Sequence, residues 1–150
     1  MRLPHDLETV HGLFTDYANS IGIDLAFQNF SAELASLPGK YAPPAGAILL
    51  ACNSSREAVG CVALRPLETA GLCEMKRLYV CPTARGYDLG RRLAIAIVDR
   101  ARDIGYARIV LDTFTSMQAA RQLYATLGFR ETTPYYDNPN ADVVYLALDL

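Results

Sequence analysis

The chain has 150 residues, of which 51% are hydrophobic and 20% are charged, and its formal net charge is −2. This balance is typical of one soluble domain over residues 1–150 with enough apolar residues for a core. An acidic chain lacks the basic field that draws nucleic acid, so we expect no nucleic-acid partner. No apolar run reaches the roughly 20 residues that cross a bilayer, and the N-terminus lacks the apolar core of a signal peptide. We therefore expect a cytoplasmic protein that does not bind membranes.

Four cysteines and two histidines offer little for a metal. The cysteines lack C-x-x-C spacing and fall in segments typical of strands, which favours buried free thiols over metal ligands or disulfides. The histidines lie near the N-terminus without an i, i+4 spacing, and surface or helix-flank positions suit them better. We expect no metal site. The cysteines are Cys52, Cys61, Cys73 and Cys81, and the histidines are His5 and His11.

The N-terminal part of the chain is expected to be helical. Apolar residues recur at helical spacing over Leu7–Ile21, with Asp6 placed to cap the helix and Gly22 to end it. A second, short helix is expected over about residues 31–37. The Pro43-Pro44 pair then marks a loop that leads into a sheet.

Three apolar, partly β-branched runs follow and predict three consecutive strands. They cover Ala47–Cys52, Ala58–Leu64 and Cys73–Cys81. Residues 53–57 and 67–71 are polar or glycine-bearing connections, and such short connections favour antiparallel pairing.

The second half of the chain alternates helices and strands. A helix is predicted from Leu89 to Ile104, ended by Gly105, and a compact apolar strand over Arg108–Thr113. Strand, helix and strand in this order predict a right-handed parallel crossover, and hence a mixed sheet. Thr115–Gln118 has the Ser/Thr-x-x-Glu/Gln form of a capping box, which opens a helix that stops at Gly128. The last strand is expected over Val143–Leu148.

The stretch from Met75 to Leu93 is typical of a strand, a glycine-bearing basic turn and a helix start. The first backbone N–H groups of such a helix have no intrahelical partner, and with the helix dipole they attract a phosphate or pyrophosphate. Arg85, Arg91 and Arg92 add positive charge around the turn. The sequence therefore indicates an anion-binding site for a small phosphorylated ligand.

The pattern Arg85-x-x-x-x-Gly90, preceded by Leu78-Tyr79-Val80 and followed by the segment Leu123–Phe129, closely resembles the GNAT superfamily of acyl-CoA-dependent N-acetyltransferases. The resemblance runs from about Leu7 to Leu150. It implies an α/β (α+β) fold with a mixed, mostly antiparallel sheet and helices on both faces. It also implies acetyl-CoA as acetyl donor, a small-molecule or protein amine as acceptor, and a homodimer as one possible state.

In this family the central strand parts from its parallel neighbour, and pantetheine enters the gap like an added strand. The resemblance implies that Leu78, Tyr79 and Val80 contact it through their backbone, and that one N–H polarises the thioester carbonyl. The side chains of such residues also pack as ordinary core residues. The pyrophosphate would bind at Arg85, Gly86, Tyr87, Asp88, Leu89, Gly90 and Arg91.

Three features depart from the family pattern. Asp88 replaces the first glycine of the turn; it either caps the next helix or, as we expect, turns outward so that CoA binds. Met117 replaces an asparagine that often contacts pantetheine, and supplies apolar contact or packs in the core. Only Met1–Pro4 and His5 precede Asp6, too few for the usual first strand, so that strand is missing or the natural chain is longer.

The family resemblance implies that Tyr124 is the general acid that protonates the departing CoA thiolate, although a core tyrosine would also fit this position. Glu74 and Asp137 are candidates for the general base, and ordered water could also accept the proton. Alternatively, Glu74 is simply an exposed strand residue and Asp137 is part of an Asp-Asn-Pro turn. Tyr135 and Tyr136 are expected to wall the acceptor pocket, with Lys40 and Tyr41 opposite them.

We therefore expect direct transfer of an acetyl group to a primary amine without a covalent enzyme intermediate, because no cysteine is placed as a nucleophile. The alternative is a non-catalytic acyl-CoA-binding or regulatory module. A dinucleotide-binding oxidoreductase is disfavoured, since no G-x-G-x-x-G follows a first strand.

Overall fold

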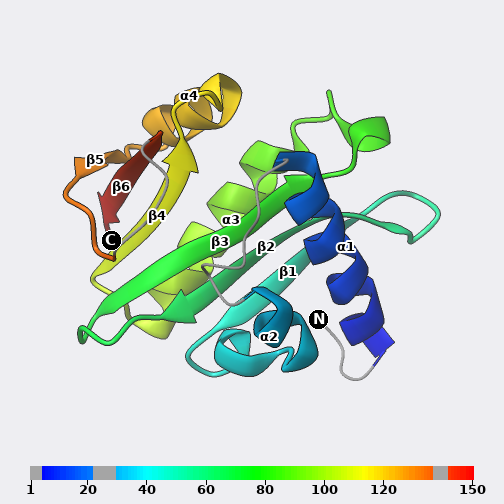
Figure 1. The fold of residues 1–150 in the computed structure, drawn as a ribbon, viewed down its shortest axis with the longest axis horizontal. Helices are drawn as coiled ribbons and strands as arrows, with labels where there is room; N and C mark the ends of the chain where they lie inside the picture. Colours follow the sequence, from blue (N-terminus) through cyan, green and yellow to red (C-terminus); the bar gives the residue numbers. More distant parts are fainter. Residues whose placement is uncertain (1–4, 22–29, 137–141) are drawn as a thin grey trace.

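An open sheet of six strands forms the centre of the molecule, which we describe from a computed structural model over residues 5–21, 30–136 and 142–150 (Figure 1). The strand order is β1-β2-β3-β4-β6-β5. The pair β3 and β4 is parallel, and the other neighbours are antiparallel. The expected mixed, mostly antiparallel sheet is confirmed. The strands are β1 (Ala47–Cys52), β2 (Ala58–Pro66), β3 (Leu72–Val80), β4 (Arg108–Phe114), β5 (Arg130–Thr132) and β6 (Val143–Asp149).

Helices cover both faces of the sheet, as expected (Figure 1). Helix α1 (His5–Ile21) packs on one face, and α2 (Phe30–Ala35) lies on that side too. On the other face α3 (Leu89–Ile104) and α4 (Gln118–Thr126) pack over a core made largely of β2, β3 and β4 side chains. Short 3-10 helices follow α2 and β3, at Gly39–Tyr41 and Pro82–Ala84. None of the helices described here is long and apolar enough to cross a membrane.

The boundaries of α3 follow the sequence signals. Gly105 has φ +107°, a left-handed conformation that glycine adopts without a steric cost, and its N–H donates to the Ala101 and Arg102 carbonyls. The helix therefore ends where the glycine predicts.

The capping box expected at Thr115 is wrong. Helix α4 begins at Gln118, Met117 is its N-cap, and no side chain caps it. The Thr115 N–H instead donates to the Asp142 carbonyl at 2.9 Å, which continues the β4–β6 ladder past Phe114. Because the sheet holds the Thr115 backbone, the helix starts later than the sequence pattern indicates.

One further strand and the exposure of two cysteines differ from the sequence-based expectations. The short strand β5 was not predicted, because three residues carry no readable period. Cys61 and Cys73 are buried free thiols, but Cys52, at the end of β1, is exposed and Cys81 is half-buried. The first strand among the described residues is β1, and Met1–Pro4 lie outside them.

Candidate active site

Strands β3 and β4 separate after a short paired segment. Their pairing covers three residue pairs, from Leu72 with Arg108 to Glu74 with Val110. Beyond these pairs both strands continue, β3 to Val80 and β4 to Phe114, without pairing to each other. The divergence implied by the family resemblance is present, and it leaves strand backbone available to a ligand.

A bulge bends β3 at the point of divergence. Two steps along β2, from Cys61 to Ala63, match three steps along β3, from Tyr79 to Lys76. Arg77 has φ +62°, in the left-handed region that side-chain-bearing residues rarely occupy. The extra residue also changes which side chains face α1: Met75, before the bulge, packs in the α3 core, whereas Tyr79 packs in the α1 core.

The gap contains a cavity of about 620 Å³. Residues 75–80 of β3 and 111–114 of β4 form its walls, and Tyr17 of α1 and Tyr124 of α4 reach it from the two sides. Of the residues assigned to CoA from the sequence, Leu78, Tyr79, Val80, Arg85, Met117 and Tyr124 line this cavity. The remaining residues of the turn lie outside its lining.

The basic turn passes into α3 through a residue in the left-handed backbone region. Asp88, just before α3, has φ +60° and makes no capping bond, so its carboxylate does not occupy the first N–H groups of the helix. A left-handed conformation explains why glycine suits this position. Arg85 Nε donates to the Val80 carbonyl at 3.2 Å, and Arg91 Nη1 contacts Thr126 Oγ1 of α4 at 3.5 Å. Tyr87 is 72% exposed.

Tyr124 combines burial with access to the cavity. Its ring packs edge-on against Phe129, with centroids 5.7 Å apart, and only 7% of the residue is exposed. Burial raises the pKa of its phenol, with smaller contributions from the nearby Tyr17 and Asp112. The hydroxyl therefore stays protonated at neutral pH, as a proton donor must.

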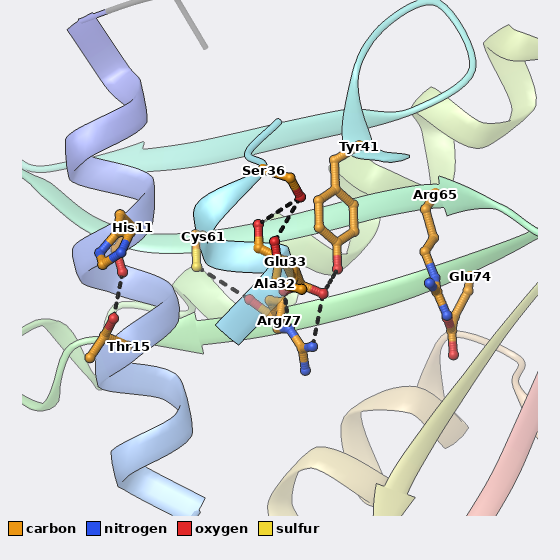
Figure 2. Close-up of polar contacts among 10 residues, drawn as sticks. All are labelled: His11, Thr15, Ala32, Glu33, Ser36, Tyr41, Cys61, Arg65, Glu74 and Arg77. Carbon is orange, nitrogen blue, oxygen red and sulfur yellow. Dashed lines mark hydrogen bonds and ion pairs between the residues drawn. The ribbon is translucent and has the colours of Figure 1, made fainter. Parts of the chain in front are cut away.

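The two base candidates from the sequence have different placements. Glu74 is fully buried, not exposed, and does not line the cavity. Its carboxylate accepts a bond from Arg65 Nε at 2.7 Å (Figure 2). It also accepts a bond from the Tyr135 hydroxyl. Asp137 lies outside the described residues.

The expected acceptor residues fall into two places. Tyr41 is buried, donates its hydroxyl to Glu33 Oε1 at 2.8 Å, and lines with Lys40 a separate cavity of about 240 Å³. Tyr135 and Tyr136 are half-buried, and their rings contact each other at a centroid distance of 5.2 Å. Neither the Lys40 pair nor the Tyr135 pair lines the cavity of about 620 Å³ between β3 and β4.

A buried ion pair supports the bulge. Glu33 of α2 accepts two bonds from the Arg77 guanidinium, at 2.9 and 3.0 Å (Figure 2). The guanidinium also lies 5.0 Å from the Phe30 ring centroid and 5.6 Å from that of Tyr17. Cys61 Sγ donates to the Arg77 carbonyl at 3.2 Å. Burial favours a raised pKa of Glu33, but Arg77, together with smaller contributions from Tyr41 and Lys76, lowers that pKa. The pair thus remains ionised.

Sequence reasoning missed three charged residues of the cavity, Lys76, Arg77 and Asp112. Burial lowers the pKa of Lys76 to about 8, although Glu74 opposes this. Burial raises the pKa of Asp112, which accepts a short hydrogen bond from the Tyr136 hydroxyl. The sequence signal that could have indicated Asp112 is a carboxylate inside the apolar run of β4. Among the residues that the structure describes, no three His, Cys, Asp or Glu side chains gather to hold a metal.

Comparison with known proteins gives the same family as the motifs. The model of the acetyltransferase (GNAT) family matches residues 12–129. An uncharacterized N-acetyltransferase of Schizosaccharomyces pombe is 43% identical over 150 residues, covering 100% of this chain and 92% of that protein.

Solved structures share the fold. A GNAT family acetyltransferase of Staphylococcus aureus has a TM-score of 0.79 at 20% identity, over 99% of this chain and 95% of its own. One from Elizabethkingia anophelis, solved with acetyl-CoA bound, has a TM-score of 0.60 at 24% identity, over 71% of this chain and 77% of its own. With a family model over most of its length and a full-length relative at 43% identity, this chain belongs to the acetyltransferase (GNAT) family of enzymes.

Proposed function

We propose that the enzyme passes the acetyl group of acetyl-CoA directly to a primary amine, with Tyr124 as the general acid. The observation that carries this proposal is that Tyr124 lines the cavity between the unpaired parts of β3 and β4. A structural neighbour with this fold was solved with acetyl-CoA, which supports the choice of donor.

The unpaired strand edge suits the pantetheine arm. The Cys81 N–H donates to the Val59 carbonyl of β2, and because strand N–H groups alternate in direction, the Val80 N–H points toward the gap. The amides of pantetheine then add to β3 as a strand would, and a backbone N–H in the gap polarises the thioester carbonyl.

The pyrophosphate is assigned to the start of α3. The free N–H groups of its first turn and the helix dipole attract the anion, and Arg85 and Arg91 supply charge beside it. Because the Asp88 carboxylate makes no capping bond there, those donors remain open to the ligand.

Tyr124 has the chemistry of the acid step. When the tetrahedral intermediate collapses, a thiolate leaves, and a protonated phenol next to it supplies the proton. The Tyr124 phenol carries its proton at neutral pH, and burial, which raises its pKa, leaves that protonation state unchanged.

The test is a coupled assay for released CoA over a panel of acceptors: amino acids, polyamines, arylalkylamines, peptides with a free N-terminus, and O-benzylhydroxylamine. Tyr124→Phe is compared with Tyr106→Phe, whose hydroxyl donates to the Ala45 carbonyl away from the cavity. We expect Tyr124→Phe to keep its acetyl-CoA affinity and lose about 100-fold in kcat, while Tyr106→Phe keeps its rate. Equal rates for wild type and Tyr124→Phe would remove Tyr124 from the mechanism. If no acceptor leads to release of CoA, the proposed acetyl transfer is wrong.

A further inference from the structure

Asp112 and Tyr124 approach the cavity from opposite faces of the sheet. Leu111 packs in the core under α3, and since side chains alternate along a strand, Asp112 points to the face covered by α1. Tyr124 belongs to the α3 core and comes from the other face. Both line the same cavity. A thioester held between β3 and β4 would thus meet a phenol on one side and a carboxylate on the other.

Asp112 differs from Glu74 in what its carboxylate can do. Glu74 is fully buried away from the cavity, with one oxygen bonded to Arg65 and the other to Tyr135. Asp112 is half-buried, lines the cavity, and is held through Oδ2 by the Tyr136 hydroxyl. Of these two carboxylates, Asp112 is the one that an acceptor in the cavity can reach.

The surroundings of Asp112 favour proton uptake. Glu74 and Lys76 face it from β3, Tyr17 from α1, Tyr124 from α4, Tyr145 opposite it on β6, and Tyr135 and Tyr136 from the segment after β5. Burial raises its pKa and Glu74 adds to the effect, whereas Tyr136 and Lys76 oppose it. A carboxylate in such a site accepts a proton more readily than one in water.

We infer that Asp112 is the general base of the acetyl transfer and that Tyr136 is its positioning residue; this rests on the proposed function. The acceptor arrives as an ammonium ion, and Asp112 takes one proton from it. The nitrogen lone pair then attacks the acetyl carbonyl carbon, forming a C–N bond, and an electron pair moves to oxygen.

The rest of the step returns every group to its starting state. Collapse of the intermediate breaks the C–S bond, and the leaving thiolate takes the proton of Tyr124. The nitrogen still carries the extra proton that it held as the attacking amine, and the phenolate takes this proton, which leaves the neutral amide. Asp112 releases its own proton to solvent. The products are the N-acetylated acceptor, the CoA thiol and one proton.

The experiment compares two acceptors that differ in protonation. One is the fastest primary amine of the panel, which is an ammonium ion at neutral pH, and the other is O-benzylhydroxylamine, whose nitrogen is already unprotonated. Wild type, Asp112→Asn, Glu74→Gln and Asp137→Asn are assayed for kcat, acetyl-CoA affinity and Tm. A general base contributes about 10²- to 10⁴-fold.

We expect Asp112→Asn to keep its acetyl-CoA affinity, to lose at least about 100-fold in kcat with the primary amine, and to lose far less with O-benzylhydroxylamine. Glu74→Gln and Asp137→Asn should affect both acceptors alike. An equal loss of Asp112→Asn on both acceptors, an unchanged rate, or a selective loss in another variant would overturn the inference. If wild type acetylates neither acceptor, the proposed function fails first.

Tyr136→Phe tests the same inference without removing the carboxylate. The Tyr136 bond favours the ionised form of Asp112, so its loss should raise the pKa of the base. The acid limb of the kcat profile should then shift to higher pH, while acetyl-CoA affinity stays the same. An acid limb at the wild-type pH would contradict the role of Asp112.

Discussion

Asp88 shows how one residue shapes the anion site through both its backbone and its charge. It occupies a left-handed conformation at the start of α3, and its carboxylate lies near the helix N-terminus without capping it. The conformation costs a side-chain-bearing residue about 1 kcal/mol, and the charge opposes a bound anion.

We expect Asp88→Asn and Asp88→Gly both to tighten acetyl-CoA binding, because each removes the negative charge. Helix-terminus charges are worth about 0.3–1 kcal/mol, or roughly threefold in Kd. Glycine should be the more stable variant by about 1 kcal/mol, because it adopts positive φ freely. Calorimetric titration and urea unfolding measure the two effects. Asp103→Asn, at the exposed far end of α3, is the control, and unchanged affinity in both Asp88 variants would refute the charge argument.

Single residues also mark the limit of prediction from sequence. The motif around Leu78–Val80 and Arg85 identified the cavity wall, because backbone binding tolerates many side chains and leaves a recognisable spacing. Asp112 and Lys76 escaped notice, since each lies in a strand whose burial depends on neighbours distant in sequence. The bulge could not be predicted either, because its left-handed position is occupied by Arg77 and not by a glycine.

At the scale of elements, one ion pair joins α2 to the bulge of β3. The Arg77 side chain is 1% exposed and that of Glu33 is 15% exposed, and the Tyr41 hydroxyl donates to the same carboxylate. Helix α2 has no fully buried residue, and beside this pair its half-buried Phe30 and Leu34 pack against the α1 core. Removal of one partner of a buried pair leaves the other charge without compensation.

Glu33→Ala should therefore lower the free energy of unfolding by about 3 kcal/mol. Asp99→Ala, which breaks the exposed pair with Arg102 on α3, should cost less than about 0.5 kcal/mol. Chemical denaturation of both variants checks the difference. If Glu33→Ala loses as little free energy of unfolding as Asp99→Ala, water reaches Arg77 in the variant. Glu33→Gln keeps an acceptor for the guanidinium and should therefore be more stable than Glu33→Ala.

The elements themselves were largely predictable, and their ends were not. Apolar periodicity found α1 and α3 because each has a long face against the sheet. The start of α4 was misplaced because a ladder bond to Asp142, remote in sequence, decides the conformation of Thr115. Local capping signals fail where the sheet holds the same backbone.

At the scale of the whole molecule, the sheet consists of two parts joined at one end. Strands β1, β2 and β3 form one part, β4, β6 and β5 form the other, and three residue pairs between β3 and β4 connect them. An extended ligand in the gap would pair with the free edges of both parts. Its binding energy should therefore appear as protection of those edges.

We expect acetyl-CoA to slow amide hydrogen exchange in peptides that cover residues 76–81 and 111–115, measured by mass spectrometry. At a ligand concentration of 100 times Kd, linkage contributes about 2.7 kcal/mol, which corresponds to roughly 100-fold slower exchange where opening requires release of the ligand. Peptides from β1 and the paired residues 72–74 are the internal control, because their hydrogen bonds exist without ligand. Protection spread evenly over the sheet would indicate general stabilisation, and no protection at residues 76–81 would contradict strand-like binding of pantetheine in the gap.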